Sequence, residues 1–238
     1  MSTWAVIAAG GTGERLGRPG GKQLVPAAGR PILALTLEAF DTSPSIDGIV
    51  LVCDRGRGSE YAAACDAPSV LGKVATVVDG GQTRQASVAS GIAAVPDDAD
   101  VIVIHDGARP LVTPGLIEAA LETLAADPRS DGVVVGHPVF DTLKIVGDDG
   151  IIVGTRDRGA LWVAQTPQVF RAERIRAAFA AAERDGYVGT DDASLVERIG
   201  GRVVLVNGPR SNIKVTVPED VVIVDAIARS RVATREGQ

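Results

Sequence analysis

Residues 4–17 read WAVIAAGGTGERLG, a short apolar run followed directly by a glycine-rich loop. Buried strands of α/β proteins are short runs of this kind, rich in Val and Ile and bounded by Gly. Glycines after such a strand let the backbone approach a ligand closely, and their N–H groups can hold phosphate oxygens. The same glycines would also serve an ordinary turn, because glycine adopts positive φ without strain. The stretch predicts the first strand of an α/β sheet and leaves open whether a phosphate binds after it.

Apolar runs and helix-like segments continue to alternate beyond this stretch. We expect strands at residues 4–8, 48–52, 74–78, 101–105, 132–136 and 203–207. We expect helices at residues 32–40, 61–65, 85–94, 114–126, 171–184 and 192–199, and a last one from residue 218. Strands that alternate with helices over short connections form a mainly parallel, twisted sheet with helices on both faces. The sequence therefore predicts a Rossmann-like α/β fold.

One segment breaks the alternation. Residues 139–145 and 151–155 flank the sequence GDDG, and two apolar runs around such a turn indicate an inserted β-hairpin. Residues 1–238 contain neither an internal repeat nor a low-complexity linker. We therefore expect a single domain that carries one inserted hairpin.

The bulk composition limits the class of protein. Apolar residues make up 45% of the chain and charged residues 23%, and the net charge of −6 argues against a broad nucleic-acid surface. The sequence predicts no leader and no membrane-spanning run. The two histidines, His105 and His137, and the two cysteines, Cys53 and Cys65, lack metal-type spacing, so we interpret all four as structural. We expect a cytoplasmic protein that contacts neither nucleic acid nor membrane.

Three polar, glycine-containing segments follow predicted strands. They are residues 8–17 (AAGGTGERLG), 79–87 (DGGQTRQAS) and 105–110 (HDGARP). Ligands of parallel sheets bind beyond the carboxyl ends of the strands, so we expect all three segments at one edge of the sheet. That edge is the predicted ligand site.

The glycine loop fits two common nucleotide-binding motifs poorly. A dinucleotide fingerprint needs G-x-G-x-x-G and an acidic residue about 20 positions on, but the spacing from Gly11 is G-x-G-x-x-x-G and Asp54 comes too late. A P-loop needs Ser or Thr after its lysine, where Gln23 follows Lys22. The loop does carry two cations, Arg15 and Lys22, which together could neutralise charge on a triphosphate. This favours nucleotidyl transfer, with a nicotinamide-dependent oxidoreductase and a non-catalytic nucleotide-binding protein as alternatives.

Seven segments occur in the order typical of one enzyme family. They are AAGGTGERLG with Lys22-Gln23, DGGQTRQASV, HDGARP, PVFDTLK, DRGALWVAQTPQVF, TDDASLVE and NIKVTVPED. On these segments the chain resembles, from Trp4 to about Ile227, the 2-C-methyl-D-erythritol 4-phosphate cytidylyltransferases of the non-mevalonate isoprenoid pathway. The resemblance implies a nucleotidyltransferase fold and attack of a polyol phosphate on the α-phosphate of CTP, with Mg²⁺ or Mn²⁺ and release of pyrophosphate. A phosphate monoester, with a second pKa of about 6, is already mostly dianionic at neutral pH, so this chemistry needs no histidine base.

The resemblance also implies roles for individual residues. Arg15 and Lys22 would stabilise the transition state, and Arg158 and Lys214 would orient the incoming phosphate. CTP would contact Ala8, Ala9, Gly10, Gly11, Gly13, Gly81 and Ser87. The polyol phosphate would contact Thr142, Thr166 and Thr190. Asp106 would hold the metal, because Mg²⁺ binds through one or two carboxylates plus phosphate oxygens and water.

In the family that the chain resembles, the hairpin is an arm that crosses to a second subunit. Residues 139–158 would then be a dimerisation arm, so we expect a homodimer in which each arm helps to form the partner's active site. The chain departs from the family pattern at Gly21, Gln82 and Gly107, where Pro, an acidic residue and Ala are common. None of these changes removes a charged residue assigned above, and a sister activity, ribitol 5-phosphate cytidylyltransferase, stays open.

Overall fold

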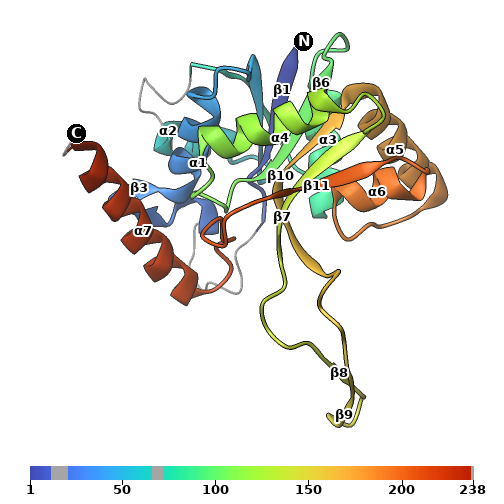
Figure 1. Ribbon diagram of the computed structural model, residues 1–238. Coiled ribbons are helices and arrows are strands. Elements are labelled where there is room, and N and C mark those ends of the chain that lie inside the picture. The colour runs from blue at the N-terminus through green and yellow to red at the C-terminus, as the bar shows by residue number, and fades with distance from the viewer. Residues whose placement is uncertain (12–20, 66–71, 237–238) are drawn as a thin grey trace.

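A seven-stranded mixed sheet forms the centre of the protein, in a computed structural model that describes residues 1–11, 21–65 and 72–236 (Figure 1). The strands of this sheet are β1 (Thr3–Ala8), β4 (Gly48–Cys53), β5 (Val74–Asp79), β6 (Val101–Asp106), β7 (Gly132–Pro138), β10 (Trp162–Arg171) and β11 (Val203–Asn207). They lie in the order β11-β7-β10-β6-β1-β4-β5. Only β10 pairs antiparallel with its neighbours, so the expected mainly parallel sheet is confirmed.

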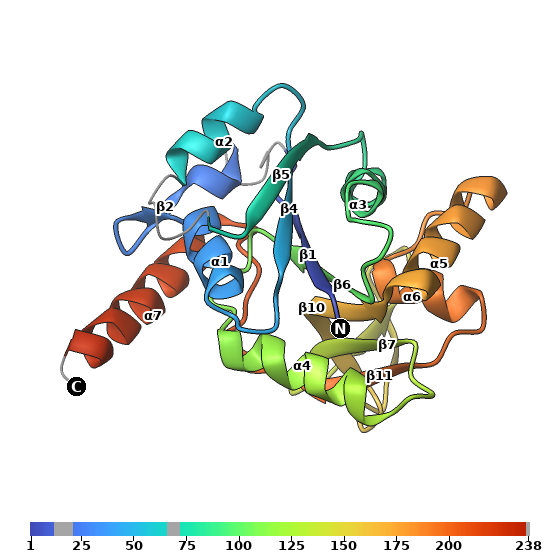
Figure 2. The ribbon, with the colours of Figure 1, turned by 90° about the horizontal axis from the view of Figure 1, so that it is seen from above.

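Helices cover both faces of the sheet, as the alternation of the sequence predicts (Figure 2). They are α1 (Ile32–Asp41), α2 (Gly58–Ala64), α3 (Arg84–Ala93), α4 (Pro114–Ala126), α5 (Ala172–Asp185), α6 (Asp192–Arg198) and α7 (Pro218–Glu236). In β1, Ala5 and Ile7 face the core shared with α1 and α4, whereas Val6 and Ala8 face the core shared with α3, α5 and α6. Because successive strand side chains point to opposite faces, a strand buried on both sides is apolar throughout.

Strand β10 is the one strand of the seven-stranded sheet that the sequence analysis missed. It lies inside the sheet between β6 and β7, although its sequence WVAQTPQVFR carries two glutamines and a proline. Both glutamines are buried and hydrogen-bonded: Gln168 Nε2 donates to Asp191 Oδ2 at 2.8 Å, and Gln165 Nε2 donates to Pro209 O at 3.2 Å. Pro167 falls where the pairing with β7 is irregular, so its missing N–H interrupts no regular ladder. The glutamines made the segment look unlike a buried strand, because the groups that satisfy them, Pro209 O and the Asp191 carboxylate, are distant in sequence.

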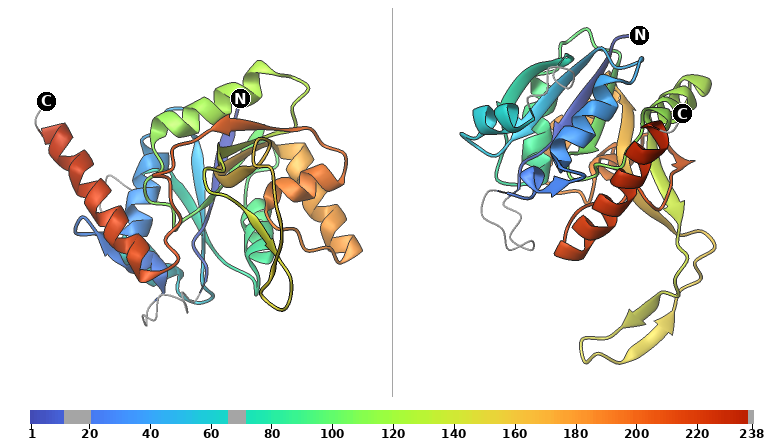
Figure 3. Two further views of the ribbon diagram at one scale, coloured as in Figure 1. Left: turned by 60° about the horizontal axis from the view of Figure 1, so that its bottom comes forward. Right: turned by 90° about the vertical axis from the view of Figure 1, so that its left-hand side faces the viewer.

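The inserted hairpin protrudes from the body of the molecule, with its paired strands β8 (Lys144–Val146) and β9 (Ile152–Thr155) at the far end (Figures 1 and 3). The first strand is shorter than the expected 139–145. The β7–β10 ladder ends where Pro138 pairs with Trp162, and pairing resumes only where Lys144 meets Thr155. Apolar side chains around the tip are exposed: Ile145, Val146, Ile151, Ile152 and Val153.

A third, smaller core joins the C-terminal helix to the segment that follows the glycine loop. That segment contains a 3-10 turn (Lys22–Leu24) and two short strands, β2 (Pro26–Ala27) and β3 (Arg30–Pro31). Buried residues of this segment and of α7 pack together: Val25, Ala27, Ile32, Val224 and Ala228. Across the described residues, no helix has both the length and the apolar character needed to span a bilayer.

Candidate functional site

The carboxyl ends of β1, β5 and β6 surround a cavity of about 210 Å³. Its lining residues are Ala8, Gly10, Gly11, Lys22, Gln23, Gly81, Gln82, Thr83, Arg84, Ser87, Asp106, Ala108 and Lys214. The three glycine-containing segments that follow strands therefore meet at one edge, as expected. Among these lining residues Lys22, Arg84 and Lys214 are cations and Asp106 is the one carboxylate, so the cavity suits an anionic ligand.

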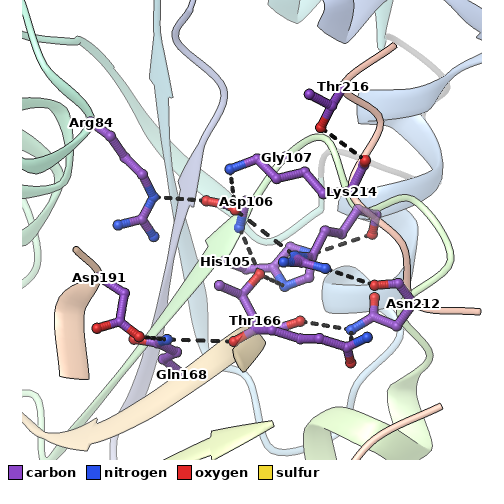
Figure 4. Close-up of polar contacts among 12 residues, drawn as sticks. Arg84, His105, Asp106, Gly107, Thr166, Gln168, Asp191, Asn212, Lys214 and Thr216 are labelled. Carbon is purple, nitrogen blue, oxygen red and sulfur yellow. Dashed lines mark hydrogen bonds and ion pairs between the residues drawn. The ribbon is translucent and has the colours of Figure 1, made fainter. Parts of the chain in front are cut away.

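Asp106 lies between two of these cations at the end of β6 (Figure 4). Its Oδ1 accepts a hydrogen bond from Arg84 Nε at 2.9 Å, and its Oδ2 lies 2.7 Å from Lys214 Nζ. Arg109 Nε is 3.9 Å from the same Oδ2. Burial alone would raise the pKa of Asp106, but these positive charges outweigh it and lower the pKa well below its ordinary value. Asp106 is therefore a fixed negative charge in a cationic pocket.

Arg84 connects this carboxylate to a second one that lies outside the cavity. Its Nη1 and Nη2 donate to Asp192 Oδ1 and Oδ2 at 3.0 and 2.7 Å, so the guanidinium binds Asp192 with two parallel bonds. Asp192 is 1% exposed and begins α6, whose N-cap Asp191 accepts the Ser194 N–H. The sequence analysis assigned no role to Arg84 or Asp192, although both occur in the segments that carried the family resemblance.

The histidine beside Asp106 is buried and hydrogen-bonded through both ring nitrogens. His105 Nδ1 lies 3.1 Å from Thr166 Oγ1, and Nε2 lies 3.3 Å from Arg109 O. Burial lowers the pKa of His105 to about 3, so the ring is neutral near pH 7. Because a carbonyl oxygen can only accept, Nε2 carries the proton and donates to Arg109 O, and Nδ1 accepts a hydrogen bond from the Thr166 hydroxyl. The Thr166 hydroxyl oxygen in turn accepts the backbone N–H of Asp106 at 3.0 Å. This chain of bonds fixes the end of β6 and leaves His105 no free nitrogen for proton abstraction.

Lys214 is placed by a segment that follows β11. The backbone N–H of Val215 donates to Ala108 O at 2.8 Å, which ties this segment to the loop after β6. Asn212 extends the connection: its Nδ2 donates to Thr166 O at 2.9 Å, and its carbonyl accepts from Arg109 Nη1 at 2.8 Å. The position of the Lys214 ammonium is thus set by bonds to β6 and β10 rather than by its own neighbours in sequence.

Another part of the cavity wall is built from small residues in close contact. Ser87 Oγ accepts the Gly81 N–H at 3.1 Å and donates to Thr83 O at 2.9 Å, which shapes the turn before α3. A Cβ at Gly81 would lie 2.5 Å from the Ala86 Cβ, and a Cβ at Gly80 would lie 2.9 Å from Ser87 Oγ. Only glycine fits at these two positions, because a Cβ there would collide with Ala86, Ser87 or the backbone of Cys53.

With this geometry established, the chain can be compared with known proteins. The family model of 2-C-methyl-D-erythritol 4-phosphate cytidylyltransferase (IspD) matches residues 3–230. The chain belongs to this family. It is 44% identical over 227 residues to the 2-C-methyl-D-erythritol 4-phosphate cytidylyltransferase of Syntrophotalea carbinolica, covering 95% of this chain and 96% of the relative. It is 42% identical to that of Geobacter metallireducens, covering 97% and 99%.

Solved structures of family members have the same fold. The crystal structure of 2-C-methyl-D-erythritol 4-phosphate cytidylyltransferase from Thermus thermophilus superposes with a TM-score of 0.77 at 33% identity, covering 96% of this chain and 100% of that one. The 4-diphosphocytidyl-2C-methyl-D-erythritol synthase of Anaerococcus prevotii gives a TM-score of 0.82 at 27% identity, covering 96% of each chain. The nucleotidyltransferase fold expected from the sequence is confirmed.

The structure gathers most, but not all, of the residues that the resemblance implicated in this cytidylyltransferase family. Those that line the cavity are Ala8, Gly10, Gly11, Lys22, Gly81, Ser87, Asp106 and Lys214. Ala9 is fully buried beside it, and its N–H donates to Val52 O at 2.8 Å. Thr166 is buried under Asp106, and Thr190 lines a separate cavity of about 110 Å³ next to Asp192.

Of the remaining four assigned residues, two are not described by the structure and two lie on the arm. Arg15 and Gly13 lie outside the described residues. Thr142 and Arg158 are exposed on the arm, where Arg158 Nη1 donates to Phe140 O. In its own subunit the arm therefore brings neither Thr142 nor Arg158 to the described part of the pocket.

Proposed function

We propose that the cavity beside Asp106 binds CTP and that the chain transfers its CMP group to 2-C-methyl-D-erythritol 4-phosphate. The observation that carries this proposal is the charge of the pocket: Lys22, Arg84 and Lys214 line it together with a single buried carboxylate, next to a turn that only glycine can form. A triphosphate matches such a pocket in charge, and family membership supplies the substrates. The oxidoreductase alternative loses its basis, because the family is one of transferases.

The chemistry requires charge neutralisation and positioning rather than proton abstraction. An oxygen of the polyol phosphate forms a bond to the α-phosphorus of CTP, and the bond from that phosphorus to the oxygen bridging to the β-phosphate breaks. Pyrophosphate leaves with the electron pair. The attacking phosphate is already mostly dianionic at neutral pH, which fits a site whose histidine is neutral and fully hydrogen-bonded.

Positive side chains would act on the charge that develops as this bond breaks. Lys22, at the edge of the cavity after the glycine loop, would neutralise charge on the α-phosphate and the departing pyrophosphate. Arg15 would act with it, as the family resemblance implies. Lys214, held 2.7 Å from Asp106, would orient the incoming phosphate. Gly10, Gly11 and the Gly81–Ser87 turn would hold the nucleotide itself, as would Ala8 and Ala9.

A divalent cation fits the pocket only together with the nucleotide. Within the described ranges, no group of three or more His, Cys, Asp and Glu side chains could hold a metal ion by itself. Asp106 supplies one buried carboxylate at the cavity wall, and Mg²⁺ binds through one or two carboxylates with phosphate oxygens and water. Asp106 would thus hold Mg²⁺, or Mn²⁺ in its place. The metal would supply further neutralisation of the triphosphate charge.

The arm at residues 139–158 would complete the site of a second subunit in a homodimer. Two observations support this: Thr142 and Arg158 lie on the arm away from their own pocket, and the arm tip exposes five apolar side chains. Large apolar surfaces around a protruding segment mark protein–protein contacts. Thr142 and Arg158 would then contact the polyol phosphate of the partner site, together with Thr166 and Thr190 of that site.

Two statements on cellular context remain predictions. A cytoplasmic location rests on cysteine usage, and both Cys53 and Cys65 are buried free thiols in the structure. Independence of nucleic acid and of membranes rests on the net charge of −6 and on the apolar pattern of the sequence. Purified protein tested for co-eluting nucleic acid and for vesicle binding would check the second of these.

A substrate panel tests the proposed reaction. Purified protein is incubated with each of the four nucleoside triphosphates, with or without Mg²⁺ or Mn²⁺, and with 2-C-methyl-D-erythritol 4-phosphate or ribitol 5-phosphate. We expect pyrophosphate release only with CTP, the metal and methylerythritol phosphate together. Robust turnover with ribitol 5-phosphate alone would assign the sister activity, and CTP binding without any turnover would indicate a non-catalytic nucleotide-binding protein.

A further inference from the structure

A cluster of three side chains behind the glycine loop contacts the backbone on both sides of it. Asp54 follows β4, Arg57 lies just before α2, and Tyr61 lies on α2. Asp54 Oδ1 accepts the N–H of Gly11 at 2.5 Å. Asp54 Oδ2 accepts the hydroxyl of Tyr61 at 2.9 Å and lies 3.6 Å from Arg57 Nη1. Both carboxylate oxygens of Asp54 are therefore engaged.

The first side of the loop packs directly on this carboxylate. A Cβ added at Gly10 would lie 3.4 Å from Asp54 Oδ1 and 3.7 Å from Ser87 Oγ, so Gly10 lies between the cluster and the first turn of α3. Gly10 and Gly11 both line the cavity. Asp54 thus determines where the backbone of the cavity wall lies, and it engages the one N–H that Gly11 has to offer.

The second side of the loop rests on the same cluster. Gly21 has a φ of +80°, and a Cβ there would lie 3.0 Å from the Tyr61 hydroxyl and 3.1 Å from Arg57 Nη1. Lys22, which follows, lines the cavity and begins the 3-10 turn. The cluster therefore contacts Gly11 and Gly21, the described residues on either side of positions 12–20. Because Lys22 directly follows Gly21, the position of Gly21 also affects that of Lys22.

The cluster is itself held firmly. Tyr61 is fully buried, and burial together with the Asp54 carboxylate raises the pKa of its hydroxyl, which therefore stays a hydrogen-bond donor. Arg57 donates from Nε and Nη2 to Glu60 at 2.7 Å each and lies 5.1 Å from the Tyr61 ring centroid. Residues that support a binding loop from behind in this way reduce the ordering that ligand binding must impose.

We propose that Asp54 is a positioning residue of the CTP site, which fixes Gly11 directly and Gly21 through Tyr61 and Arg57. The inference rests on the proposed function, since it concerns how the cavity receives CTP. Asp54 does not line the cavity; it sets the position of the Gly11 backbone, which does. No pattern in the sequence predicts this role, and Asp54 enters the sequence analysis only as an acid at the wrong distance for a dinucleotide site.

The control comes from the opposite end of the same two strands. Asp47, just before β4, accepts the N–H of Thr3 at the start of β1 with its Oδ2 at 2.7 Å. Asp47 and Asp54 thus make the same kind of carboxylate–amide bond at opposite ends of the β1–β4 pair, and of the two bonds only that of Asp54 involves a cavity-lining residue, Gly11. A purely structural carboxylate–amide bond should behave alike at both ends.

The experiment compares Asp54→Ala, Asp54→Asn, Tyr61→Phe and Asp47→Ala with the wild type. We expect Asp54→Ala to raise both the Kd and the KM for CTP about tenfold, because the lost bond has a charged acceptor. Asp54→Asn keeps an acceptor oxygen for Gly11 and should stay within about threefold of the wild type. Tyr61→Phe should raise KM about threefold, and Asp47→Ala should lower Tm without changing KM.

A second readout needs no turnover. In ¹⁵N-labelled protein, hydrogen exchange of the Gly11 amide should accelerate at least about tenfold in Asp54→Ala and remain slow in Asp54→Asn and Asp47→Ala. The inference is overturned if Asp54→Ala keeps its Kd and KM for CTP within twofold of the wild type, or if Asp47→Ala changes them equally. Should Asp54→Ala not fold, an unchanged KM in Tyr61→Phe overturns it instead. Failure of the proposed function would show differently, as a wild type that binds CTP but turns over no polyol phosphate.

Discussion

Arg84 and Asp192, 108 residues apart in the sequence, form a two-bonded ion pair with N–O distances of 3.0 and 2.7 Å. The third donor of the same guanidinium, Nε, binds Asp106 at 2.9 Å. A buried carboxylate at the start of α6 therefore holds the arginine that orients the one carboxylate lining the cavity. Because a guanidinium is planar, fixing two of its nitrogens on Asp192 also fixes the direction in which the third one points.

Removal of Asp192 should affect both stability and catalysis. In Asp192→Ala, Arg84 loses its anchor, so we expect a free energy of unfolding lower by about 1–3 kcal/mol and a fall of roughly tenfold in kcat/KM. Arg84→Lys keeps the charge but lacks the planar fork, and should lose a similar amount. A double-mutant cycle with Arg84→Lys and Asp192→Asn, read by urea unfolding and by kcat/KM, should be non-additive. Additive losses would mean that the two residues act separately.

Substitution of Lys22 should separate turnover from binding. If its charge acts mainly on the transition state, Lys22→Ala lowers kcat by roughly 100-fold while the Kd for CTP rises far less. Lys73→Ala is the matched control, because Lys73 Nζ donates to Ser43 O at 2.6 Å and does not line the cavity. Pre-steady-state release of pyrophosphate and calorimetric titration with CTP measure the two quantities. A loss confined to KM would contradict the proposed role.

Mixed dimers should show whether the arm acts across subunits. A heterodimer of Lys22→Ala and Arg158→Ala subunits would contain one site with Lys22 from one chain and Arg158 from the other, both intact. We expect about half of the wild-type activity per heterodimer, whereas each homodimer of a variant is nearly inactive. Differently tagged chains, co-expressed and purified through both tags, provide the sample. If Arg158 serves its own subunit, the heterodimer has no intact site and recovers nothing.

The buried histidine should make the protein less stable as the pH falls. His105 has a pKa of about 3 when folded and 6.5 as its ordinary value, so between these values the unfolded chain binds the additional proton. The free energy of unfolding should therefore fall by about 1.4 kcal/mol per pH unit from this group as the pH drops below 6.5. The lowered pKa of Asp106 adds a loss of the same sign, but only near and below its ordinary value of 3.8.

Urea unfolding at pH values from 7 to 4.5 measures this slope without interference from Asp106. His105→Gln should be less stable at pH 7 yet lack the additional slope between pH 6.5 and 4.5. Equal slopes in the wild type and in His105→Gln would show that His105 does not titrate on unfolding.

The elements that the sequence predicted well are those whose burial follows from local pattern. Strands β1 and β6 are apolar on both faces because helices cover both sides of the sheet. Helix α4 begins at Pro114 after the N-cap Thr113, as expected. Strand β10 was missed because Gln165 and Gln168 find their partners across the fold, in Pro209 and Asp191. A local sequence pattern cannot predict that a polar residue is buried when its hydrogen-bond partner lies elsewhere in the chain.

The candidate site likewise has features that the sequence predicts and features that depend on tertiary packing. The order of strands and helices was enough to predict that the segments after β1, β5 and β6 meet at one edge, since parallel strands share an edge. The family motifs predicted Asp106, Lys22 and Lys214, which all line the cavity. The bonds from Arg84 to Asp106 and Asp192, and from Asp54 to the Gly11 amide, become visible only in the folded chain. These bonds depend on the direction of side chains from elements distant in sequence, and that direction is fixed only when the helices pack on the sheet.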